Sequence, residues 1–170
     1  MRTRLVSGVI GAVLAVGLTV TAVAPASAET VQQTRFIKGQ TAVTVDAQAV
    51  VALDFFDVKV SVVWPASGTS PAFTFPVYGN PNDGTTELAG GLVFQANDKC
   101  ADAILPVIDT NTGVVRAWVN SGRRVEVFKV DGDKLVLTAA GAQWLNSSLG
   151  FNGLFTAGFL FGTFKTTLNR

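Results

Sequence analysis

Residues 43–53, VTVDAQAVVAL, and residues 135–145, LVLTAAGAQWL, decide the fold that this sequence predicts. Each stretch begins with the alternation of a β-strand and changes to a helical pattern at a residue that favours helix N-termini, Asp46 or Thr138. The apolar helical faces would carry Ala49, Val50 and Leu53 in the first stretch, and Ala142, Trp144 and Leu145 in the second. We therefore predict two strand-to-helix corners, at opposite ends of a sheet sandwich.

The chain outside these corners has the pattern of short strands joined by turns. The expected strands cover residues 58–64, 73–78, 90–94, 104–109, 114–119, 123–130, 134–138 and 159–168, and residues 65–71 are expected to form a loop. Many of the connections contain Asn, Asp and Gly, which adopt the positive φ angles of hairpin turns at low cost. We predict a mainly β fold, an antiparallel β-sandwich with two short α-helices.

The first 28 residues have the three regions of a secretory signal peptide. Arg2 and Arg4 form a basic start, residues 5–23 contain no charged residue, and Ala26-Ser27-Ala28 is a small-residue cleavage site. The apolar run approaches the length of a membrane-spanning helix, so a retained anchor is the alternative. Its many Gly and Ala residues and the cleavage site favour removal. We therefore expect a secreted protein, free or held at the cell surface, with no membrane span after cleavage.

The exported chain is predicted to have a polar lead-in at residues 29–40 and a single domain at residues 41–170. Loss of Arg2 and Arg4 leaves 11 of the 13 basic residues against 12 acidic ones. This near-neutral balance, without a basic cluster larger than two adjacent arginines, gives no electrostatic footprint for nucleic acid.

The composition excludes several classes of chemistry. The sequence has no His, which removes Ser-His-Asp and Cys-His nucleophiles and imidazole metal ligands. Its single cysteine, Cys100, allows neither an internal disulfide nor a thiolate zinc site, and we expect it in the core rather than in an intermolecular disulfide. Asp54 and Asp57 could act as an acid–base pair only across a cleft, so a solvated helix end explains them better. The sequence therefore predicts a protein that is not an enzyme and binds no metal.

Two turn sequences, at residues 80–84 and 109–113, are similar to the start of a calcium-binding loop. Neither has the terminal Glu or the spacing of oxygen ligands that such a loop requires. Plain turn chemistry is the better interpretation.

Tyr78 and Trp118 are the candidate ligand-binding residues. An exposed aromatic ring with a polar group can hold a sugar, a peptide or a flat ligand. Trp118 shares its strand face with Val114 and Arg116, a mixed face that leaves both a buried and an exposed ring open. Tyr78 ends a strand before Gly79 and carries the chain's only phenol, which could either ligate iron or rest in water.

The C-terminal run at residues 149–164 alternates Phe with Gly. It is too short and too interrupted by Gly to cross a membrane as a helix. It predicts either a bulged closing strand buried on both faces or a patch that meets a partner. The second possibility would make the protein self-associating.

The order of several segments resembles the HtaA-like domain of secreted and cell-surface proteins of high-GC Gram-positive bacteria. These segments are VTVDAQAVVAL, TFPVYG, GGLVF, VVRAWV, LVLTAAGAQWLNSSLG and FTAGFLFGT, and together they extend from about Thr41 to the C-terminus. The resemblance implies a β-sandwich with two short helices. It also implies haem binding at the cell envelope, through an axial Tyr supported by a His.

This chain departs from the HtaA-like pattern at the haem ligands. It has no His, and the segment that matches the family's ligand Tyr is TRFIKGQTAV at residues 34–43, without Tyr. Tyr78 does not match that position, so no haem-binding residue is carried over and no cofactor is expected. The expected function is that of a secreted, non-catalytic domain that binds a small ligand or a cell-envelope partner. The alternative is a structural or self-associating envelope protein without a small-molecule ligand.

Overall fold

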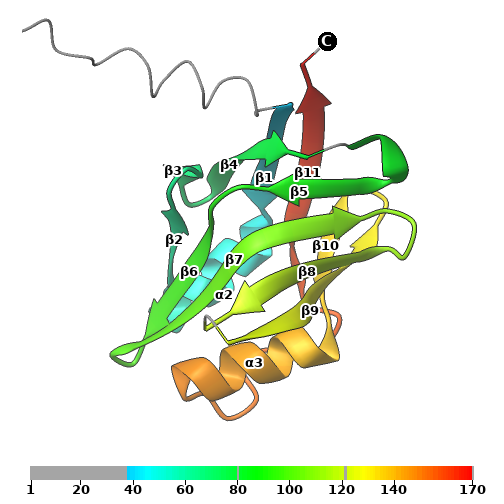
Figure 1. The fold of residues 1–170 in the computed structure, drawn as a ribbon. Helices are drawn as coiled ribbons and strands as arrows, with labels where there is room; N and C mark the ends of the chain where they lie inside the picture. Colours follow the sequence, from blue (N-terminus) through cyan, green and yellow to red (C-terminus); the bar gives the residue numbers. More distant parts are fainter. Residues whose placement is uncertain (1–37, 80, 121, 170) are drawn as a thin grey trace, which may run out of the picture.

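Residues 38–79, 81–120 and 122–169 are described by the computed structural model, and they form a mainly β domain with two helices (Figure 1). The strands are β1 (Gly39–Val45), β2 (Lys59–Val63), β3 (Ser67–Thr69), β4 (Ala72–Tyr78), β5 (Thr85–Leu88), β6 (Gly91–Ala96), β7 (Lys99–Asp109), β8 (Val114–Val119), β9 (Arg123–Asp131), β10 (Lys134–Leu137) and β11 (Leu160–Leu168). The helices are α2 (Ala47–Phe55) and α3 (Ala139–Leu149), and the turn η1 covers Pro81–Asp83. The predicted signal peptide at residues 1–28 and most of the lead-in at residues 29–40 lie outside the described residues.

The antiparallel sheet closes on itself. Within the described chain, eight strands pair in the ring β7–β5–β4–β1–β11–β10–β9–β8 and return to β7, while β6, β2 and β3 extend it. The long strand β7 makes this possible, because its first half pairs with β6 and its second half with β5. The predicted mainly β class with two short helices is confirmed, and the layers of the expected sandwich are parts of one sandwich-like barrel.

Both strand-to-helix corners are confirmed. After β1, the Asp46 side chain accepts a hydrogen bond of 2.9 Å from the N–H of Gln48 and caps α2. After β10, the Thr138 hydroxyl accepts one of 2.9 Å from the N–H of Gly141 and caps α3. These bonds satisfy N–H groups that lack partners within a helix. The predicted inward faces are buried, except that Val50 is only half-buried.

The two corners lie at the same end of the barrel, so the prediction of opposite ends is wrong. Strands β1 and β10 flank β11 and are both antiparallel to it, which makes them parallel to each other. Val45 and Leu135 both pair with Gly162, near the start of β11. After β1 and after β10, the backbone therefore leaves the sheet at the same end of the barrel. In Figure 1, α2 consequently lies behind the lower part of the barrel and α3 lies beneath it.

The barrel interior is filled by aliphatic and aromatic side chains. The largest fully buried ones include Trp144, Phe73, Phe75, Phe94 and Leu149. The C-terminal run contributes Phe155 and Phe161 to this core. Because β11 pairs with β1 on one side and β10 on the other, it is a closing strand, and its register against β10 shifts at a bulge, as predicted. The expectation that this strand is buried on both faces is wrong, because Thr163, Lys165 and Thr167 point outward and are exposed. No helix among the described residues is both long and apolar enough to cross a membrane.

Candidate ligand-binding site

Trp118 lies on the outer wall of the barrel. Along β8, the side chains of Val115, Ala117 and Val119 point inward and are buried, so the side chains between them point outward. Trp118 is 45% exposed. It pairs in register with Ile104 of β7 and with Arg124 of β9, whose side chain is also exposed.

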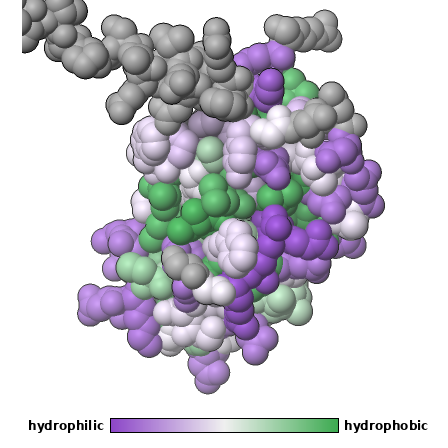
Figure 2. Space-filling view, in the orientation of Figure 1, coloured by the Kyte–Doolittle hydropathy of each residue, from purple (hydrophilic) through white to green (hydrophobic). Residues whose placement is uncertain are grey.

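A bulge in β7 brings a second large apolar side chain to this wall. The register of β7 against β8 shifts between Ile104 and Val107, and Leu105 adopts a left-handed φ of 49°. The N–H of Leu105 donates a hydrogen bond of 2.8 Å to the carbonyl of Gly90. Leu105 is 41% exposed. We define the β7–β8 patch as Ile104, Leu105, Val107 and Trp118. Figure 2 shows hydrophobic side chains gathered in the middle of this face, over β6 and β7, with hydrophilic side chains around them.

The conformation of Leu105 costs stability in two ways. A left-handed backbone brings the Cβ of an L-residue close to a carbonyl oxygen, and this costs about 1–2 kcal/mol. The exposed side chain also gives up part of the burial that usually stabilises a leucine. Strained residues of this kind gather at binding sites, where the strain presents a side chain. Leu105 is therefore the strongest local indication of a contact surface on this wall.

Replacement of Leu105 by Gly is expected to change the free energy of unfolding by less than about 1 kcal/mol. Glycine adopts positive φ freely, and this relief of about 1–2 kcal/mol offsets both its entropic cost of about 0.5–1 kcal/mol and the loss of the buried part of the leucine side chain. Urea denaturation measures the difference. Leu88→Gly, at a buried position of β5, is the control and should lose at least about 3 kcal/mol. A comparable loss at Leu105 would show that its side chain serves the core.

Tyr78 faces the same outer wall from the end of β4. It is half-buried and pairs with Glu87 of β5, which in turn pairs with Val107 of the β7–β8 patch. Tyr78 and Trp118 thus share a wall but are separated by β5 and β7. Burial first, and the negative charge of Glu87 second, raise the pKa of the Tyr78 phenol, against an opposing effect of Arg124. At neutral pH the hydroxyl therefore stays protonated and can donate a hydrogen bond.

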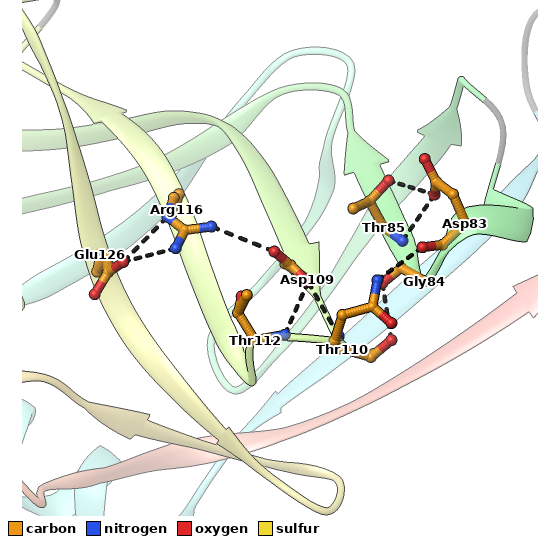
Figure 3. Close-up of polar contacts among 9 residues, drawn as sticks. Asp83, Gly84, Thr85, Asp109, Thr110, Thr112, Arg116 and Glu126 are labelled. Carbon is orange, nitrogen blue, oxygen red and sulfur yellow. Dashed lines mark hydrogen bonds and ion pairs between the residues drawn. The ribbon is translucent and has the colours of Figure 1, made fainter.

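Arg116 has its own partners on this wall, as Figure 3 shows. Its guanidinium lies 2.7 Å from an oxygen of Glu126 and 3.3 Å from one of Asp109. The hydrogen bond to Glu126 is the main cause that raises the pKa of Arg116. Hydrogen bonds from Thr112, followed by weaker effects that include Arg116, lower the pKa of Asp109. Arg116 therefore neutralises carboxylates of the protein itself.

The two turns that are similar to calcium loops are joined to each other by hydrogen bonds. The Asn111 side chain donates a hydrogen bond of 2.7 Å to the carbonyl of Asp83, and the Thr110 hydroxyl donates one of 2.8 Å to the carbonyl of Gly84 (Figure 3). The Asp83 carboxylate accepts bonds from the N–H and hydroxyl of Thr85. Among the described residues, no three potential metal-ligating side chains gather in one place. These interactions are those of turn chemistry.

The sequence matches no protein-family model and no curated protein sequence. Among solved structures, the chain is similar to the C-terminal domain of HtaA from Corynebacterium glutamicum, with a TM-score of 0.50 and 13% identity. The match covers 77% of this chain and 96% of that domain. The chain has the fold of an HtaA domain. At this level of identity the likeness concerns the fold alone, and the site must be argued from this chain's own residues.

Three other residues considered from the sequence are not part of the β7–β8 patch. Cys100 is exposed near the start of β7, with its Sγ 3.6 Å from the side-chain nitrogen of Gln95. The prediction of a core position is therefore wrong. Asp54 and Asp57 are both exposed, as predicted, and Asp57 lies 3.7 Å from the Lys59 ammonium.

Proposed function

We propose that this protein is a secreted, non-catalytic binding domain of HtaA fold, which holds a flat apolar ligand against the β7–β8 patch. The observation that carries the proposal is that an exposed Trp118 and a strained, exposed Leu105 lie on neighbouring strands of the outer wall. Exposed apolar side chains that stand together commonly mark a binding surface. The predicted signal peptide at residues 1–28 supports export of the remaining chain.

The residues around the patch indicate the kind of ligand. The indole of Trp118 offers a face for stacking, and Leu105 and Val107 offer aliphatic contact. Arg124, in register with Trp118, can meet an anionic group at the ligand's edge, and the Tyr78 hydroxyl can donate a hydrogen bond. A flat apolar ring with a carboxylate at its rim fits this set.

Haem has that shape, but this chain does not fit haem ligation through its iron. The sequence contains no His, and burial and Glu87 oppose the phenolate form of Tyr78 that would bind ferric iron. The patch offers stacking and apolar contact instead, and Arg124 offers a positive charge beside it. The proposed binding mode therefore requires no bond to a metal, and haem and a metal-free porphyrin are suitable probes of it.

Haemin and metal-free protoporphyrin IX are expected to bind with similar affinity, measured by quenching of tryptophan fluorescence. Trp118→Ala should weaken both by at least about tenfold, because loss of ring stacking and apolar contact removes more than about 1.4 kcal/mol. Phe55→Ala is the control, because Phe55 is an exposed aromatic residue on α2, behind the barrel. Tyr78→Phe should leave the haemin Soret band unchanged.

Two results would contradict the proposed function. Absence of binding by both probes would exclude the flat anionic ring as the ligand class. Binding of haemin alone, with a Soret shift that Tyr78→Phe abolishes, would assign the site to iron ligation. Either result can be separated from misfolding by the far-UV circular dichroism of each variant.

A further inference from the structure

A cavity of about 210 Å³ lies between the C-terminal end of α2 and the segment that joins α3 to β11. Figure 1 shows α2 behind the barrel, on the side opposite to β7 and β8. We call this cavity the phenylalanine pocket, and its lining residues are Ala52, Leu53, Phe56, Leu154, Phe155 and Phe159. It shares no residue with the β7–β8 patch.

The lining residues differ in burial, and this shows which end of the pocket is open. Leu53 and Phe155 are only 6% and 5% exposed, so they form the floor. Phe56 is 43% exposed and lies at the mouth. An occupant therefore has one end on the floor of the pocket and the other in water, beside Phe56.

The chemistry of the pocket favours an apolar occupant. All six lining side chains are apolar. The backbone carbonyls of Ala52, Leu53 and Phe159 already accept hydrogen bonds from other N–H groups of the domain. A polar ligand would give up its hydrogen bonds to water here and gain few in return, and a bound water needs two to four polar partners.

The walls of the pocket are held in place without a ligand. The Asn146 side chain accepts a hydrogen bond of 2.9 Å from the N–H of Phe155 and donates one of 2.7 Å to its carbonyl. The rings of Phe56, Phe151, Phe155 and Phe159 meet one after another edge to face, with centroids 6.3, 6.1 and 6.3 Å apart. The pocket is therefore formed in advance, and a hydrocarbon group that fills it gains van der Waals contacts that the lining lacks.

The volume sets the size of the occupant. An engineered apolar cavity of about 150 Å³ binds benzene. At about 210 Å³, the phenylalanine pocket accommodates a hydrocarbon group of this size or somewhat larger. It is too small for the flat ring proposed for the β7–β8 patch.

We propose that the phenylalanine pocket binds the hydrocarbon end of a small amphiphile, such as a medium-chain carboxylate, whose polar group remains in water beside Phe56. The amphiphile comes from solution rather than from a membrane. In a bilayer the chain ends lie at the centre of a hydrocarbon core about 30 Å thick, where a pocket of a folded domain does not reach them.

Isothermal titration calorimetry with hexanoate, octanoate, decanoate and dodecanoate tests the proposal. The affinity should rise about fourfold for each added CH₂ group while the chain is filling the pocket. It should stop rising before dodecanoate, because the rest of the chain then stays in water. An affinity that rises through the whole series would indicate unspecific association and would overturn the proposal.

Two variants of the lining change the pocket in opposite directions. Ala52→Leu partly fills it and should weaken octanoate binding at least tenfold. Ala47→Leu is the matched control, because Ala47 lies on the same helix but is exposed and does not line the pocket. Leu154→Ala enlarges the pocket and should move the end of the rise to a longer chain, an effect that misfolding would not produce.

The pocket and the β7–β8 patch can be tested separately. Trp118→Ala should leave octanoate binding unchanged, and Ala52→Leu should leave protoporphyrin IX binding unchanged. Absence of octanoate binding, or binding that survives Ala52→Leu, would overturn the proposal whatever the result at the patch. Co-sedimentation with phosphatidylcholine vesicles that Ala52→Leu abolishes would overturn the assignment to an amphiphile from solution.

Discussion

Replacement of Trp144 by Ala is expected to lower the free energy of unfolding by about 4 kcal/mol, because loss of a fully buried ring leaves a cavity. Trp144 is 1% exposed on the inner face of α3. Its ring meets that of Phe94 edge to face, with centroids 6.1 Å apart. Its indole N–H donates a hydrogen bond of 3.3 Å to the side-chain oxygen of Asn120. Truncation removes this edge-to-face contact and leaves the side-chain oxygen of Asn120 without the indole N–H as a donor.

Urea denaturation followed by far-UV circular dichroism measures the effect. Trp118→Ala is the matched control, because the same truncation on the outer wall removes a ring that is already half in water. We expect it to cost less than about 1.5 kcal/mol. If the two variants lost similar stability, Trp144 would not be the residue that holds α3 on the barrel.

The corners could be predicted because their signals are local. In each one the hydrophobic period changes from two to about 3.6 at a single residue, Asp46 or Thr138, and that residue then caps the helix. The inward position of Trp144 follows from the same period. Neither inference requires knowledge of which distant strands are neighbours.

The closure of the barrel could not be predicted, because it depends on pairing between residues far apart in sequence. No local pattern indicates that one edge of β7 pairs with β8 while its other edge pairs with both β5 and β6. The relative placement of the corners failed for the same reason. The short strands β3, Ser67–Thr69, and β5, Thr85–Leu88, were missed because their polar sequences have the composition of loops.

The candidate site could be predicted only in part. Trp118 was identified from its chemistry, but its mixed strand face left its exposure undecided. Leu105 was missed, although Pro106 inside a strand pattern is a recognised sign of a bulge. The burial of Cys100 was predicted wrongly because its position within a strand was not recognised. Strand β7 begins at Lys99, before the segment in which alternation was recognised, so the side of the sheet on which Cys100 lies could not be counted.

Gly141 gives a prediction in which local propensity and tertiary packing disagree. In a helix, replacement of Gly by Ala normally adds about 1 kcal/mol of stability. At position 141, however, a Cβ atom would lie 2.3 Å from the carbonyl oxygen of Val127, because α3 rests directly on the backbone of β9. A backbone oxygen in a paired strand cannot move aside as a flexible side chain can.

We therefore expect Gly141→Ala to lower the free energy of unfolding by about 2 kcal/mol, since overpacking typically costs 1–3 kcal/mol and here also shifts a helix. Gly122→Ala is the control, because its added Cβ would meet its nearest neighbour, the Asn120 carbonyl oxygen, at 3.6 Å. That substitution should change stability by less than about 0.5 kcal/mol. Thermal and urea unfolding of the two variants decide between the two effects. A stabilised Gly141→Ala protein would mean that helix propensity prevails and that α3 does not approach β9 this closely.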